Sequence, residues 1–351
     1  MLNSFLKSNL LTQFVSVFDV LFALIVVAPL VVTFWSTTWM LYDAFILPSD
    51  PVVSGFVSWA FGFFGQMILM FHQDAIKRFL NFEKRSFLNI FCLKLYALFL
   101  GHTFVSFWRG VWMCVDATSS KDLGVVCSNI VQNIITLMIM KAFRNTLVPP
   151  FIVLTDTREQ YSMRTLLEKH KADGSFRYFF DCMTTMFVEM LVAFIWHDFW
   201  FIHDSNIFPH DLFYSALSSL VFGYSLALIC FTIQSCVGAV CEKHDDQKVF
   251  IFDVFAMVSL LSAINVWRGV WSFVAYFTDG NKEWILILNT LAWGLLMIVN
   301  CTFSLSAKDV LKDAEKPGKC CTEFETRYLT KMLFKKTDEK SDVTRNISTR
   351  L

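Results

Sequence analysis

The pentapeptide Trp-Arg-Gly-Val-Trp occurs twice in this chain, at residues 108–112 and again at residues 267–271. Arg is rare inside apolar segments because its charge is costly to bury there. Chance is therefore a poor explanation for the repetition of the pentapeptide. The two copies lie 159 residues apart, which is close to half of the 351-residue chain. The repetition predicts a chain built from two copies of one structural unit.

Further matches extend the repeat well beyond the pentapeptide. At a spacing of 161 residues, identical side chains recur as Trp35 and Trp196, Trp39 and Trp200, Asp43 and Asp204, Pro48 and Pro209, Asp50 and Asp211, Ser54 and Ser215, and Gly62 and Gly223. The spacing falls to 159 at the pentapeptide, so the first copy has two more residues between these positions. The repeated unit therefore includes several helix-length segments.

The composition is that of a polytopic membrane protein. Hydrophobic residues make up 55% of the chain and charged residues 17%, whereas soluble domains carry about 25% charged residues. The formal net charge is zero, which leaves nucleic-acid binding without an electrostatic basis. We therefore expect the lipid bilayer to be the main partner of the chain.

Eight continuous apolar runs are long enough to cross a bilayer as helices. They lie near residues 18–42, 52–72, 87–113, 123–141, 178–202, 212–240, 249–277 and 284–306. The runs do not alternate polar and apolar residues, which favours helices over a membrane barrel. Four helices return the chain to the side from which it started. We therefore expect an all-α bundle of eight transmembrane helices, built as two parallel four-helix repeats.

The runs divide the chain into four regions: a first membrane repeat at 1–141, a basic cytosolic linker at 142–177, a second membrane repeat at 178–306, and a cytosolic tail at 307–351. We expect one short helix around 158–171 in the linker. In the tail, residues 323–336 predict an amphipathic helix that rests on the membrane, with disorder from about residue 337.

The distribution of Lys and Arg predicts the orientation. The N-terminus, the linker, the tail and the loops after the second and sixth runs hold 25 of the 30 basic residues, whereas the opposite loops hold two. Basic residues mark the cytosolic side. Both termini should therefore be cytosolic, in a plasma-membrane protein.

Two arginines inside the apolar runs are the first candidate functional residues. Arg109 and Arg268 lie toward the outer ends of their runs, on the same side as Asp43 and Asp204. We expect the repeat-matched ion pairs Arg109–Asp43 and Arg268–Asp204. An aromatic belt with snorkelling arginines and a contact with a ligand or ion are the alternatives. Gly110 and Gly269 would permit close helix approach.

Three further ionisable residues lie within the apolar runs. Lys94 and Asp253 occupy equivalent positions in the two copies, and we expect them to form one central pair across the pseudo-two-fold axis. A gated ion or proton path and a snorkelling Lys94 are the alternatives. Glu189 lies in the middle of the fifth run, and it is either a contact for an ion or ligand or a protonated, hydrogen-bonded side chain.

Histidines and cysteines give weaker signals. His197, His203 and His210 each precede an aspartate near the outer end of the fifth run; a solvated rim is favoured over a metal or proton site. Cys114 and Cys127 flank an outer loop and are either disulfide-bonded or free, and Cys320 and Cys321 form a candidate palmitoylation site.

The eight-run layout and the duplicated pentapeptide resemble the Fuseless family of multipass membrane proteins. The residues that carry this resemblance are Trp108, Arg109, Gly110, Val111 and Trp112, and again Trp267, Arg268, Gly269, Val270 and Trp271. It covers residues 15–306 and not the tail. It implies an association with presynaptic terminals and with the organisation of active zones and calcium channels there. The family supplies no catalytic residues.

No enzyme motif occurs in the chain, and we expect neither catalysis nor a cofactor. The first functional hypothesis is a non-enzymatic organiser that supports synaptic transmission, with synaptic membrane or channel proteins as partners. The alternative is a secondary transporter or ion channel that uses polar groups at the repeat interface. The sequence gives no oligomeric state.

Overall fold

The computed structural model describes residues 14–80, 86–156, 163–168, 174–244, 247–306 and 310–313, together with residues 324, 326, 328 and 329. These residues form eight long α-helices and no β-strand. The helices are α2 (Ala28–Phe45), α3 (Pro51–Phe79), α4 (Phe87–Thr118), α5 (Leu123–Ile139), α6 (Ser175–Asn206), α7 (Leu212–Lys243), α8 (Lys248–Thr278) and α9 (Lys282–Ile298). The expected all-α fold is confirmed.

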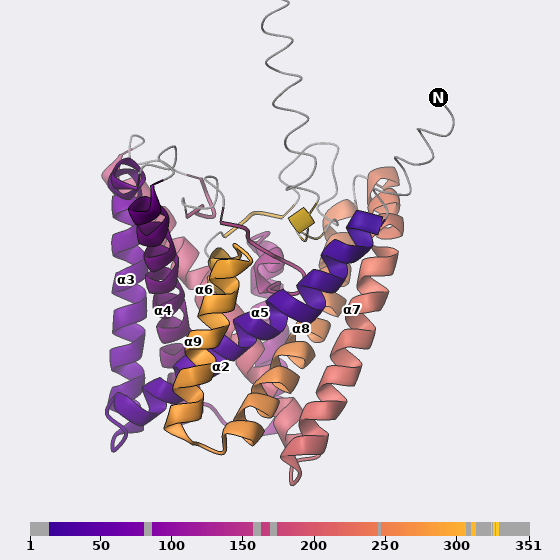
Figure 1. Ribbon diagram of the computed structural model, residues 1–351. Helices are drawn as coiled ribbons and strands as arrows, with labels where there is room; N and C mark the ends of the chain where they lie inside the picture. The colour runs from indigo at the N-terminus through magenta and orange to yellow at the C-terminus, as the bar shows by residue number, and fades with distance from the viewer. Residues whose placement is uncertain are drawn as a thin grey trace, which may run out of the picture.

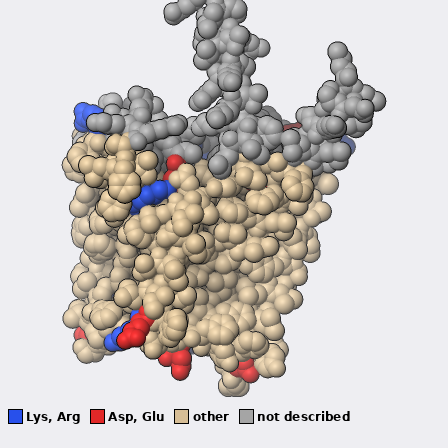
Figure 2. All heavy atoms as spheres, in the orientation of Figure 1, with Lys and Arg blue, Asp and Glu red and all other residues tan. Residues whose placement is uncertain are grey.

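Six of the helices are long and apolar enough to cross a membrane. The first of them runs from Phe14 to Phe45; it includes α2 and, directly before α2, a short π-helical segment, Ala23–Val27. The helices α5 and α9 are shorter, with 17 residues each. Figure 2 shows that charged side chains lie near two opposite ends of the bundle, with an uncharged band between them. The fold is therefore consistent with a multipass membrane protein.

Four helices surround the bundle axis and four pack outside them. Tryptophan side chains from α2, α4, α6 and α8 meet at the axis. Among the outer helices, α3 packs along α4 and α7 along α8, while α5 packs on α6 and α9 on α2 (Figure 1). The last helix of each half of the chain therefore packs on the first helix of the other half.

Capping residues explain why equivalent helices begin at equivalent positions. The Asp50 carboxylate accepts a hydrogen bond from the Val53 N–H at the start of α3, and Asp211 does the same for Tyr214 in α7. An aspartate at this position satisfies a backbone donor that the helix leaves free. The repeat-matched aspartates at 50 and 211 are therefore helix caps.

Two glycines permit α3 and α4 to approach closely. A Cβ atom on Gly110 would lie 2.4 Å from the Trp59 backbone nitrogen, and one on Gly62 would lie 2.3 Å from the Phe107 nitrogen. In the second half, a Cβ atom on Gly269 would lie 2.6 Å from the side chain of Leu220. The expected close approach at Gly110 and Gly269 is confirmed.

The linker prediction is wrong for residues 143–156, which enter the bundle. Phe143 and Phe151 are fully buried, and Val153 and Leu154 are buried beside them. Residues 163–168, the described part of the expected linker helix, form no helix. Hydrophobic side chains in this basic segment are drawn into the interior because water would otherwise surround them.

The tail prediction is also wrong at one residue. Phe324 is buried rather than resting on the membrane, and its ring centroid lies 4.6 Å from that of Phe151 and 5.2 Å from that of Phe255. Most of the expected helix at 323–336 and the expected disorder from 337 lie outside the described residues.

Candidate functional site

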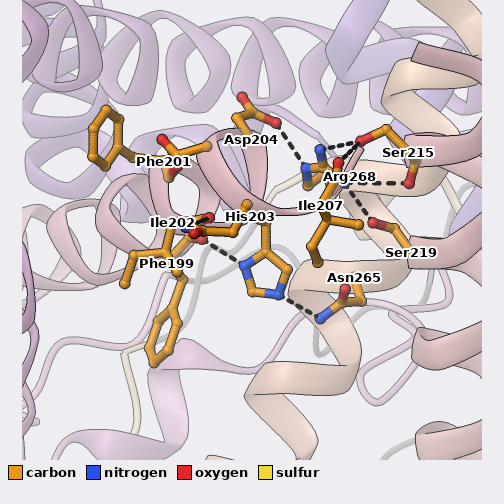
Figure 3. Close-up of polar contacts among 12 residues, drawn as sticks. Phe199, Phe201, Ile202, His203, Asp204, Ile207, Ser215, Ser219, Asn265 and Arg268 are labelled. Atoms are coloured by element: carbon orange, nitrogen blue, oxygen red, sulfur yellow. Dashed lines mark hydrogen bonds and ion pairs between the residues drawn. The ribbon is translucent and has the colours of Figure 1, made fainter. Parts of the chain in front are cut away.

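Arg268 lies at the centre of a polar cluster between α6, α7 and α8. Its guanidinium donates to Asp204 Oδ1 at 2.8 Å, to Ser219 Oγ at 2.6 Å and to Ser215 Oγ at 2.6 Å, as Figure 3 shows. Arg268 itself is buried, whereas the side chain of Asp204 is 55% exposed. The cluster therefore holds a buried cation with its counter-ion at the bundle surface.

The first half of the chain contains the same cluster. Arg109 donates to Asp43 Oδ1 at 2.9 Å, to Ser58 Oγ at 2.6 Å and to Ser54 Oγ at 2.8 Å. Both ion pairs expected from the sequence are present. The four serines were not predicted as partners, although their recurrence at a spacing of 161 residues was the signal that could have found them.

Eight tryptophans form two closed squares around the bundle axis. The inner square joins Trp35, Trp108, Trp196 and Trp267 with ring-centroid distances of 5.4–5.9 Å. The outer square joins Trp39, Trp112, Trp200 and Trp271 with distances of 5.4–5.8 Å. Neighbouring rings meet edge to face, the favoured geometry for aromatic pairs. We call these eight side chains the tryptophan cage.

The tryptophan cage encloses a cavity of about 160 Å³ that the eight indoles line alone. A second cavity, of about 80 Å³, lies on the other side of the inner square and includes Glu189 in its wall. Backbone segments that follow α5 and α9 also line this second cavity. The axis of the bundle is therefore partly hollow on both sides of the inner square.

The aromatic belt, which the sequence left open as an alternative, is thus wrong for the inner square, whose rings turn toward the axis instead of the lipid. The indole N–H of Trp196 donates to the Thr146 carbonyl at 3.2 Å, and that of Trp35 to the Leu305 carbonyl at 2.9 Å. Trp35, in the first half, is therefore bonded to the turn that follows α9, and Trp196, in the second half, is bonded to the turn that follows α5. These bonds satisfy indole donors that would otherwise be buried without a partner.

The central pair expected between Lys94 and Asp253 is absent. Lys94 instead donates to a carboxylate oxygen of Asp156 and to Asn300 Oδ1, the latter at 2.7 Å. Asp156 comes from the buried stretch of the former linker, which the sequence assigned to the cytosol. The pairing failed because that stretch brings its own carboxylate to the lysine.

Asp156 and Asp313 join the two halves of the chain. Asp156, which follows the first half, caps a turn at the end of the second half, and Asp313, which follows the second half, caps a turn at the end of the first. Asp156 Oδ1 accepts from the Phe303 N–H at 2.9 Å, at the start of the turn Thr302–Leu305. Asp313 accepts from the N–H groups of Phe143 and Arg144, at 2.7 and 3.1 Å, in the equivalent turn of the first half. We call these two contacts the crossed caps. Burial raises the pKa of the Asp313 carboxyl to about 6, against the effect of its backbone donors.

Asp253 occupies the position in α8 that Lys94 occupies in α4. It is 4% exposed, and its Oδ1 has no hydrogen-bond partner among the described residues. The Asp313 carboxyl lies close enough to interact electrostatically with the Asp253 carboxyl. The two halves therefore differ at this position: a Lys–Asp pair in the first corresponds to two neighbouring carboxyls in the second.

Comparison with known proteins gives the family of the chain. The model of the Fuseless family matches residues 14–305, which include every helix described above. The chain belongs to the Fuseless family. No curated protein and no solved structure matches it.

Glu189 is buried in this Fuseless-family chain, on α6 and against α3. With its amide nitrogen turned toward the carboxylate, Gln66 donates to Glu189 Oε2 at 2.9 Å and to Oε1 at 3.3 Å. Gln66 is fully buried, and no pattern in the sequence identified it as a partner of Glu189. The hydrogen-bonded arrangement is one of the two that the sequence left open.

The histidines of the Fuseless-family chain do not converge. His197 is buried and bonds Asp198 at 2.9 Å and Asp116 at 3.1 Å, whereas His203 bonds the Phe199 carbonyl and Asn265. No group of three potential metal ligands occurs within the described residues. The solvated rim expected for these histidines is wrong at His197, because α4 covers it.

The cysteine predictions have different outcomes. Cys114 and Cys127 are exposed free thiols, so of the two states left open the structure contains the unbonded one. Cys320 and Cys321 lie outside the described residues.

Proposed function

We propose that the chain is an eight-span plasma-membrane protein with both termini in the cytosol, built from two parallel four-helix repeats. The proposed order of regions is repeat, basic segment, repeat and tail, with part of the basic segment folded into the bundle. The recurrence of the Arg109 cluster around Arg268, with matching atoms at each contact, supports the duplication. The basic residues of the termini and connecting loops support the orientation.

Within that architecture, we propose a non-enzymatic organiser that supports synaptic transmission by acting on presynaptic channels or active-zone proteins. The observation that carries this proposal is that each of three buried cations, Arg109, Arg268 and Lys94, is held in place by hydrogen bonds to its neighbours. Arg109, Arg268 and Lys94 each contact at least one carboxylate and one further acceptor. Charges held in this way favour a rigid scaffold, which acts through its surfaces and its tail. Family membership supports the presynaptic setting.

A second candidate function is a secondary transporter or ion channel. The observation that favours it is the pair of axial cavities, one lined by the tryptophan cage and one by Glu189. Transport would require water to continue from these cavities past the crossed caps to the cytosolic end. Buried side chains such as Phe143 and Phe303 occupy that region, so the scaffold is the better-supported function.

Proximity labelling in neurons tests the organiser. A biotin ligase fused after Leu351 should label calcium-channel or active-zone proteins, because the tail would lie on the cytosolic side of the presynaptic membrane. The control is the same ligase on an unrelated multipass plasma-membrane protein expressed at an equal level. Labelling of these proteins no stronger than in the control would contradict the organiser.

A further inference from the structure

The tryptophan cage has the dimensions of a cation-binding site. The edges of its two squares measure 5.4–5.9 Å, and the centre of a square with such edges lies about 4 Å from each ring centroid, within the ~6 Å range of cation–π attraction. The cavity of about 160 Å³ is lined by the indoles of both squares. A cation there would contact several indoles at once.

The lining of the cage determines which cations fit. The inner indole N–H groups of Trp35, Trp196 and Trp267 donate to backbone carbonyls of the surrounding turns. No carboxylate or carbonyl belongs to the lining of the cage cavity. A small, strongly hydrated metal ion would therefore lose its water without gaining oxygen ligands. A weakly hydrated organic cation loses less and gains the attraction of the rings.

The cage is reached from the end of the bundle at which α2 ends and α3 begins. The outer square is only partly buried, whereas the inner four indoles are 2–7% exposed. Acidic residues predominate at that end. The carboxylates there are Asp43, Asp50, Asp116, Asp122, Asp204, Asp211, Asp279 and Glu283, against Arg109, Lys121, Arg268 and Lys282. Such a surplus concentrates cations at the entrance.

Within the described part of the chain, no Lys or Arg side chain supplies this cation. The ring of His197 lies 5.0 Å from that of Trp112, but His197 is not part of the cavity lining and is bonded to Asp116 and Asp198. Arg109 and Arg268 adjoin cage tryptophans in the sequence, yet their guanidinium groups point into the serine clusters against α3 and α7. Lys282 lies over the ring of Phe45, 5.2 Å from its centroid. The cavity inside the cage is thus left to an external ligand.

We propose that the tryptophan cage binds a quaternary ammonium group, carried by a small soluble molecule or by a lipid headgroup. The site does not depend on the presynaptic role: an organiser would use it as a ligand sensor, and a transporter as a substrate site. Recognition rests on charge and on the size of the alkylated head, because the indoles that line the cage supply no oxygen ligand.

Binding of radiolabelled choline to the full-length protein tests this proposal. In nanodiscs of phosphatidylglycerol, choline should bind saturably and be displaced by tetramethylammonium. The neutral isostere 3,3-dimethylbutan-1-ol should not displace it, because it has the same shape without the charge. Absence of saturable binding, or equal displacement by the isostere, would overturn the proposal.

Variants place the binding in the cage. Trp112→Leu and Trp271→Leu should each weaken choline binding about tenfold, whereas Trp112→Phe should retain most of it because an aromatic face remains. Trp284→Leu is the matched control, since Trp284 is 57% exposed on α9 and away from the cage. Equal weakening of choline binding by Trp284→Leu would overturn the assignment. Unchanged choline binding in both Trp112→Leu and Trp271→Leu would also overturn it.

The lipid of the nanodisc separates the two sources of the ligand. If a lipid headgroup occupies the cage, phosphatidylcholine nanodiscs should suppress choline binding. If a soluble molecule is the ligand, choline should bind equally in both lipids. Either result, together with the charge dependence, supports a quaternary ammonium site.

Discussion

Replacing Arg109 with alanine is expected to lower the free energy of unfolding by about 3–5 kcal/mol, the cost of breaking a buried charged network. The substitution removes every donor that holds Ser54 Oγ and Ser58 Oγ to α4, and it leaves Asp43 without its counter-ion. Arg268→Ala should cost a similar amount, because the second cluster has the same contacts. Unfolding of the purified protein in mixed micelles measures both.

Two control variants separate the buried contacts from the ion pair. Asp43→Asn should cost less than Arg109→Ala, because its amide oxygen can still accept from Arg109 Nε and water reaches position 43, where the side chain is 51% exposed. Arg109→Lys should fall between the two, since an ammonium group lacks the planar fork that reaches one carboxylate and two serines. An Asp43→Asn loss as large as that of Arg109→Ala would contradict the assigned role of the serines.

Replacing Asp156 with alanine is expected to cost about 3–5 kcal/mol, because it leaves the Lys94 ammonium buried with only Asn300 as a partner. It also removes the acceptor of Thr302 Oγ1 and of the Phe303 N–H, which join the two halves of the chain. The same unfolding measurement in mixed micelles gives the loss.

Asp313→Ala is the matched control for the crossed caps. It removes the equivalent backbone contacts but leaves no buried cation unpaired, and it relieves the repulsion of Asp253. We expect a smaller loss than for Asp156→Ala. Adding Lys94→Met to Asp156→Ala should recover part of the stability, because the unpaired charge disappears. Absence of any recovery would show that the Lys94–Asp156 pair is not the source of the effect.

The sequence predicted the features that both halves of the chain share. Arg109, Arg268 and their aspartates could be paired because each pair is repeated at nearly constant spacing in helices of predicted direction. Gly110 and Gly269 could be assigned to close helix contacts for the same reason. Periodicity and duplication are local signals, and they fix which helix ends lie together.

The sequence did not predict contacts made by irregular backbone inside the bundle. Asp156 lies in a basic stretch that resembles a cytosolic loop, and nothing local shows that it turns back to Lys94. The tryptophan cage was missed for a different reason. Tryptophan near a membrane surface usually belongs to an interfacial belt, and only the contacts among four helices show that Trp108 and Trp267 face the axis.

The most direct test of this account is the side-specific modification of single cysteines by a membrane-impermeant thiol reagent. Three single-cysteine variants are made in a background without native cysteines: one restores Cys114, one changes Lys94 to cysteine, and one changes Asp253 to cysteine. Each variant is exposed to the thiol reagent from one side of the membrane at a time. The account predicts that Cys114 reacts from the extracellular side only and that positions 94 and 253 react from neither. Modification at 94 or 253 that depends on ions or pH would contradict a closed, charge-paired core and favour transport.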